Sequence, residues 1–107
     1  MKKSGAKKGA AKQSNKKPGA LSDTKLEFCF RVVDGKKVRS IIGLSNALER
    51  MSDDSFYHHA NGQRNDFGNW IRDIFGLKNL ADDISKAQSR MAAQVVLLKF
   101  LVKKLRN

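Results

Sequence analysis

The spacing of apolar residues changes from alternating to helical at about residue 40. Before that point apolar and polar positions alternate, and the apolar set is Leu26, Phe28, Phe30 and Val32. A period of two is typical of a half-buried strand. Asp34-Gly35 then predicts a tight turn, with a short return strand over residues 36–39. We expect a β-hairpin that packs on the rest of the fold, because a lone two-stranded hairpin is unstable in water.

Four helices are predicted beyond residue 40, over about residues 41–51, 53–60, 66–75 and 78–86, and the third has the spacing of an amphipathic helix. Ser40, Ser52 and Asn65 immediately precede three of them and are good helix N-caps. Gly76 predicts the end of the third helix. The apolar side chains of that helix share one arc and are expected in the core: Phe67, Trp70, Ile71, Ile74 and Phe75.

A last helix is predicted to begin at Arg90, and it is apolar on most of its circumference. Leu97 and Leu101 widen its main stripe, while Val96 and Phe100 face nearly the opposite side. Such a helix is either buried between layers or touches a second molecule. The main stripe consists of Met91, Val95, Leu98, Val102 and Leu105.

Together these patterns predict an α+β fold that is predominantly α, with an N-terminal β-hairpin packed on four to five short helices. A single small domain would cover residues 26–107, preceded by a lysine-rich tail over residues 1–25. The tail has no aromatic residue, and Leu21 is its one large aliphatic residue. Because it cannot bury enough apolar surface to offset its chain entropy, we expect the tail to be disordered.

Positive charge lies at the two ends of the 107-residue chain, whose formal net charge is +12. The first 25 residues hold eight lysines against Asp23, a net charge of +7. Residues 26–89 carry nine basic and nine acidic side chains, whereas residues 90–107 carry a charge of +5 without any acid. A partner with negative charge would therefore be bound by the two ends.

Targeting and redox features favour a cytoplasmic protein. Cys29 is the only cysteine, so no disulfide can form within the chain, which fits a reducing compartment. No apolar segment follows the first lysines, which argues against a signal peptide. The longest apolar run, Val95 to Val102, is interrupted by Lys99 and is too short for a membrane span.

Two runs in the middle of the chain resemble a known domain family. They are "MSDDSFYHH" over residues 51–59 and "RNDFGNWIRDIFG" over residues 64–76. They are similar to the pattern of a small prokaryotic domain of unknown function, found in archaea and small-genome bacteria, and the similarity covers roughly residues 27–90. The family often has Asp where this chain has Leu77, which affects only a helix start. The resemblance implies a prokaryotic, archaeal origin and a helical fold, and it implies no activity.

Catalytic and metal chemistry are the less favoured interpretations of the polar residues. His58 and His59 are adjacent, so on a helix they point about 100° apart and cannot easily bind one ion. One histidine in the core and one at the surface is the preferred interpretation. Asp66 and Asp73 are about 10 Å apart along a helix, so capping and the helix dipole explain them better than paired-carboxylate catalysis. We therefore predict a non-enzymatic protein without metal or cofactor.

Helices 66–75 and 78–86 could also form a helix-turn-helix. Asp82 and Asp83 on the second helix would repel phosphate, so a plain helical hairpin is preferred.

The predicted function is non-specific association with nucleic acid, DNA or RNA, as a nucleoid- or ribosome-associated accessory factor. The C-terminal helix could add self-association or a protein partner. The alternative is a protein–protein adaptor whose tail provides solubility or docks on an acidic partner. The residues expected to contact phosphates are Lys2, Lys3, Lys7, Lys8, Lys12, Lys16, Lys17, Lys99, Lys103, Lys104 and Arg106.

Overall fold

The computed structural model describes residues 17–106 and confirms an α+β fold that is predominantly α. The predicted disorder of the tail up to residue 16 lies outside the described residues. The elements are η1 (Leu26–Phe28), β1 (Phe30–Arg31), β2 (Lys37–Val38), α3 (Ile41–Arg50), α4 (Asp53–His59), α5 (Asp66–Trp70), η2 (Ile71–Phe75), α6 (Lys78–Ser85) and α7 (Arg90–Arg106).

The predicted helix boundaries are confirmed by the capping contacts. The side chains of Ser40, Ser52 and Asn65 each accept a hydrogen bond from the backbone N–H three residues further on. These bonds satisfy N–H groups that have no partner within the first turn of a helix. Gly76 has a φ of 70°, the left-handed conformation that glycine adopts without a steric penalty. It ends η2, a π-helical turn that continues α5.

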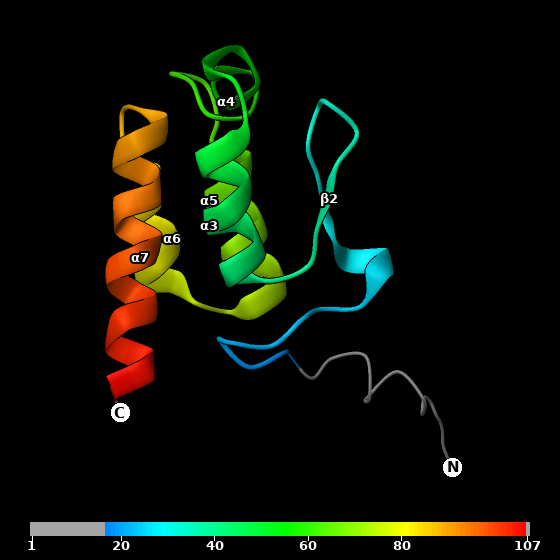
Figure 1. The fold of residues 1–107 in the computed structure, drawn as a ribbon, viewed down its shortest axis with the longest axis vertical. Coiled ribbons are helices and arrows are strands. Elements are labelled where there is room, and N and C mark those ends of the chain that lie inside the picture. The colour runs from blue at the N-terminus through cyan, green and yellow to red at the C-terminus, as the bar shows by residue number, and fades with distance from the viewer. Residues whose placement is uncertain (1–16, 107) are drawn as a thin grey trace.

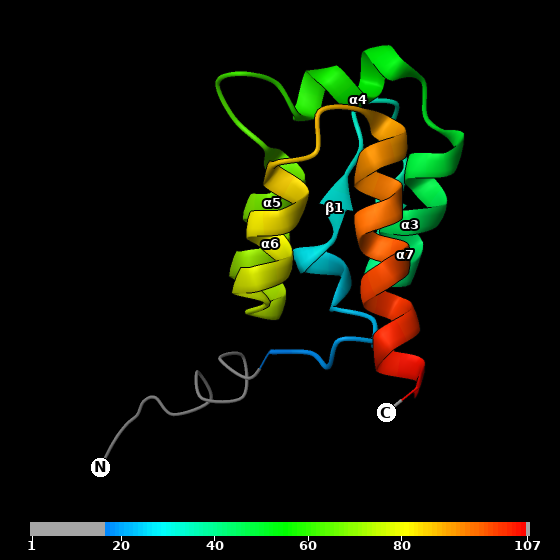
Figure 2. The ribbon, with the colours of Figure 1, turned by 90° about the vertical axis from the view of Figure 1, so that its left-hand side faces the viewer.

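Helix α7 packs lengthwise against α3 on one side and α6 on the other (Figures 1 and 2). It runs antiparallel to α3. Arg90 at its start donates a hydrogen bond to the carbonyl oxygen of Leu48, near the end of α3, at 2.8 Å. One turn further along, the Gln94 amide donates to the carbonyl oxygen of Ser45 at 3.3 Å. These contacts fix the rotation of α7 about its axis.

The core is centred on the aromatic side chains of the hairpin, α4 and α5. Phe30 of β1 stacks on Phe67 with ring centroids 5.0 Å apart, and Phe67 stacks on Phe56 at 5.7 Å. Trp70 is buried as predicted, and its indole N–H donates to the carbonyl oxygen of Phe28 at 2.8 Å. Of the predicted arc, only Ile74 is half-buried rather than buried.

The predicted first strand is wrong over residues 26–28, which form the short 3₁₀ turn η1. Strand β2 is only two residues long, and it pairs with Phe30 and Arg31. Residues 26–28 instead close a turn in which the N–H groups of Phe28 and Cys29 bond to carbonyl groups three residues earlier. Leu26 is therefore exposed, although the alternating pattern would place it in the core.

The predicted hairpin is confirmed, but its turn lies one residue earlier than expected. The N–H of Gly35 donates to the carbonyl oxygen of Val32 at 2.8 Å, so Val33 and Asp34 are the central residues. Gly35 follows them with a φ of 100°, which a residue with a side chain rarely adopts.

Residues just before the predicted domain start at residue 26 already pack onto the fold. Thr24 is buried, and its N–H donates to the carbonyl oxygen of Arg39 at 2.6 Å. The Arg39 side chain donates in turn to the carbonyl oxygen of Thr24 at 3.0 Å. This reciprocal pair fastens the end of the basic tail beside the start of α3.

Helix α6 is held against α5 by a close approach at Gly68. A Cβ atom at this position would lie 2.4 Å from Oγ of Ser85 and 3.1 Å from the carbonyl oxygen of Ala81. An added side chain would have to move the Ser85 hydroxyl and to shift the α6 backbone at Ala81 by a few tenths of an ångström. Glycine at this position therefore lets α5 and α6 pack closely.

Candidate nucleic-acid interface

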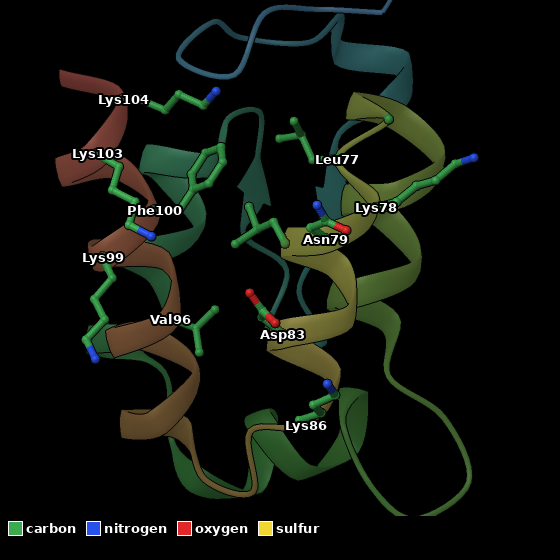
Figure 3. A pocket seen from close by; sticks show the side chains of 12 residues that line it. Leu77, Lys78, Asn79, Asp83, Lys86, Val96, Lys99, Phe100, Lys103 and Lys104 are labelled. Atoms are coloured by element: carbon green, nitrogen blue, oxygen red, sulfur yellow. The ribbon is translucent and has the colours of Figure 1, made fainter. Parts of the chain in front are cut away.

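A groove of about 850 Å³ runs between α6 and α7 (Figure 3). Side chains of α7 form one wall, and α6 along its whole length, with the residues just before it, forms the other. We call this feature the lysine groove. Its lining residues are Gly76, Leu77, Lys78, Asn79, Leu80, Asp83, Lys86, Val96, Lys99, Phe100, Lys103 and Lys104.

The rotation of α7 explains which of its side chains enter the lysine groove. Ala93, Leu97 and Leu101 are spaced four residues apart and are buried, so this line faces the core. Val96 and Phe100 lie on the α6 flank of that line and are half-buried. They form an apolar floor, and the exposed lysines of α7 that line the groove are Lys99, Lys103 and Lys104.

The lysine groove is strongly cationic. Five lysines line it against one carboxylate, that of Asp83. All five are exposed, and Figure 3 shows the side chains of Lys103 and Lys104 beside Phe100, whereas those of Lys78 and Lys99 extend away from the space between the two helices. The Lys104 ammonium lies 5.5 Å from the centroid of the Phe100 ring, within the range of a cation–π contact. Such a concave surface of one charge sign attracts polyanions.

The basic tail joins the fold at one end of the lysine groove. The Lys17 ammonium donates a hydrogen bond to the carbonyl oxygen of Asp73 at 2.8 Å. Its aliphatic chain passes over Gly76, where an added Cβ would lie 2.7 Å from Cδ of Lys17. Gly76 itself lines the groove. Lys17 is thus the first described residue of the basic tail, and it lies beside the lysine groove.

Only some of the residues predicted to bind phosphate line the lysine groove. Lys99, Lys103 and Lys104 line the lysine groove together, whereas Arg106 is exposed on α7 but does not line it. Lys17 lies at the end of the groove, on Asp73. The remaining predicted residues lie outside the described part of the chain: Lys2, Lys3, Lys7, Lys8, Lys12 and Lys16.

Lys78 and Lys86 are groove residues that were missed by the sequence prediction. They lie at the two ends of α6, a helix disfavoured for phosphate binding because of Asp82 and Asp83. Only Asp83 lines the groove. The sequence does contain a signal for these two lysines. They lie about two turns apart on α6, and the apolar face of α6 is well defined. Its pairing with α7 is a tertiary contact that no local pattern reveals.

The histidine pair is divided between core and surface, as preferred from the sequence. His59 is buried and His58 is exposed. Nδ1 of His59 lies 3.0 Å from the Asp66 carboxylate, and its Nε2 accepts the N–H of Val33 at 3.0 Å. An acceptor role for Nε2 requires that Nδ1 carries the proton, which it donates to Asp66. Both nitrogens are thus engaged in joining the hairpin to α4 and α5.

Between residues 17 and 106 no three His, Cys, Asp or Glu side chains are grouped closely enough to hold a metal ion. None of the helices within that same stretch combines the length and apolar character needed to cross a membrane.

Comparison of the chain with models of known families, with curated proteins and with solved structures gave no match in any of the three cases. The resemblance to a small prokaryotic domain family therefore stays a prediction.

Proposed function

We propose that this protein is a non-enzymatic factor that associates with nucleic acid without sequence preference, at the nucleoid or the ribosome. The observation that carries the proposal is the convergence of cationic groups from three segments. The two ends of α6 contribute Lys78 and Lys86, helix α7 contributes three further lysines, and Lys17 of the tail lies beside them. A phosphate backbone entering the groove would meet all three.

The type of residue favours contacts to phosphate rather than to bases. Lysine is a point charge on a flexible stem, whereas reading a base edge usually needs a planar, bidentate group such as arginine. Contacts to phosphate position a protein on nucleic acid but carry no sequence information. The groove contains no arginine among its lining residues. Binding is therefore expected to be governed by charge and salt.

A protein–protein adaptor is the second candidate function. It is favoured by the exposed apolar side chains on the outer face of α7, which the lysine groove does not use. In this case the tail would provide solubility or dock on an acidic partner.

The test is the affinity for duplex DNA and for RNA, measured by fluorescence anisotropy over a series of salt concentrations. Each neutralised phosphate contributes about −0.9 to the slope of log K against log salt on duplex DNA. With about six lysines engaged, the full chain should give a slope of about −5. Removing residues 2–16 deletes six lysines and should flatten it to about −1 to −3, the remainder coming from the lysine groove.

A DNA of scrambled sequence serves as the control and should bind with almost the same affinity. If the shortened protein binds as tightly and with the same slope, the tail is not a contact and this mechanism is wrong. If neither protein binds DNA or RNA at low salt, the adaptor function takes precedence.

A further inference from the structure

The outer face of α7, on the α3 flank, carries an apolar surface with no partner within the described residues. Five apolar side chains of α7 lie there with exposed fractions between 43 and 72%. This is the main stripe predicted from the sequence, and it is not buried. We call it the apolar seam: Met91, Val95, Leu98, Val102 and Leu105.

The spacing of the apolar seam is that of a coiled-coil helix. Its members follow one another at intervals of four, three, four and three residues, which is the a/d alternation of a heptad. In this register Val95 and Val102 are a positions, and Met91, Leu98 and Leu105 are d positions. A β-branched residue at a with leucine at d is the combination that favours pairing of two helices. A lipid surface needs no such register.

The flanks of the apolar seam are unlike each other. On one side Gln94 and Leu101 pack into the fold, Gln94 through its hydrogen bond to α3. On the other side are Lys99 and Arg106, which occupy e positions and are exposed. Helix α7 carries no acidic residue at all. The open flank is therefore purely cationic.

Ile42 of α3 is also exposed and extends the apolar surface towards that helix. Because α3 and α7 are antiparallel and Ser45 lies level with Gln94, Ile42 lies about level with Leu98, one turn further along. A helix lying on the seam would therefore rest in part against α3.

We propose that the apolar seam binds an amphipathic helix of another protein that has a heptad apolar stripe and carboxylates facing Lys99 and Arg106. Charge complementarity decides between the possible occupants. A second copy of this chain would bring another wholly basic helix, and like charges across a helix pair are unfavourable. An acidic helix would place glutamates against the cationic flank. The proposal is independent of nucleic-acid binding and gives the adaptor function a surface and a partner chemistry.

The test uses the full chain and a designed three-heptad peptide with Ile at a, Leu at d and Glu at e and g, by isothermal titration calorimetry. The control peptides are one with Lys at e and g, and one with the acidic composition in scrambled order. Only the acidic heptad peptide should bind. Leu98→Gln with Val102→Gln leaves the charge unchanged and should weaken its binding at least about tenfold, because two apolar contacts are lost.

A second pair of variants tests the charge. Lys99→Gln with Arg106→Gln should weaken binding of the acidic peptide about two- to fivefold, as expected for two exposed ion pairs. Lys36→Gln with Lys37→Gln removes the same charge from the hairpin and should leave binding unchanged. All four positions are exposed, so these variants should keep the fold. The affinity of the Leu98/Val102 variant for duplex DNA should stay within about twofold, which separates this proposal from the nucleic-acid proposal.

Several outcomes would overturn the proposal. Equal binding of the acidic and basic heptad peptides would remove the charge argument. An undiminished affinity in the Leu98/Val102 variant would place the peptide on lysines elsewhere, and no binding up to about 1 mM would exclude the partner. A dimer of the full chain that the same variant abolishes would identify a second copy as the occupant. Binding of phosphatidylserine vesicles, lost in that variant, without binding of the peptide would identify a membrane.

Discussion

The two flanks of α7 differ in what they offer to a partner, although one continuous helix supplies both. On the α6 side the lysine groove combines an apolar floor with five exposed lysines among its lining residues. On the α3 side the apolar seam carries aliphatic side chains in heptad order, with cations along only one edge. The first surface suits a flexible polyanion, and the second suits a shaped apolar helix. A helix that is apolar almost all round can thus contribute to the core and to two adjoining surfaces, which share Lys99 at their border.

The buried residues of α7 between the two flanks are Ala93, Leu97 and Leu101, and we call them the core line. They should contribute more to the free energy of unfolding than the exposed residues of α7. Leu97 is buried, while its neighbour Leu98 is nearly half exposed on the apolar seam. Leu97→Ala should lower the free energy of unfolding by about 2–5 kcal/mol, the range for a buried leucine. Leu98→Ala should lower it by less than about 1.5 kcal/mol, because little additional surface is exposed. Urea unfolding followed by the fluorescence of Trp70 measures both.

The two leucine variants are matched, since each replaces leucine by alanine in the middle of α7 and changes helix propensity equally. Equal costs would mean that the exposed face of α7 is packed in solution, either by a second copy or by the preceding tail. The distinction between core line and apolar seam would then be wrong.

A smaller effect, of opposite sign, is expected from the one carboxylate of the lysine groove. Asp83→Asn should raise the affinity for duplex DNA about two- to threefold at low salt, because it removes a repulsive charge beside the phosphates. Asp82→Asn changes the net charge equally on the neighbouring residue, which does not line the groove. The Asp82→Asn variant should change the logarithm of the affinity by less than half as much as Asp83→Asn does. Equal gains would show that net charge alone governs binding.

Local features of the fold could be predicted from the sequence because short-range physics determines them. Three helices are capped by Ser40, Ser52 and Asn65. Each side-chain oxygen accepts the backbone N–H three residues further along, and this contact does not depend on distant parts of the chain. The arc around Trp70 was predicted from periodicity, and the left-handed Gly76 from its place after that arc. The division of His58 and His59 between surface and core followed from helix geometry.

The rest depended on tertiary contacts. The alternating pattern over residues 26–28 looked like a strand, but no strand residue pairs with it, and the Phe28 carbonyl is instead bound by Trp70. The lysine groove arises because α6 and α7 pack side by side, which places Lys86 with Lys99 although they are on different helices. Which stripe of α7 would be buried was left open, because several of its stripes are apolar and periodicity cannot choose among them.

The salt dependence of DNA binding in two charge-matched variants tests the central claim, that the lysine groove binds the phosphate backbone. Lys103→Gln with Lys104→Gln removes two cations from the groove, and Lys36→Gln with Lys37→Gln removes two from the distant hairpin. The groove variant should flatten the slope of log K against log salt by about 1–2, because two phosphate contacts are lost. The hairpin variant should keep the slope of the unmodified protein. Identical slopes in the two variants would contradict the claim.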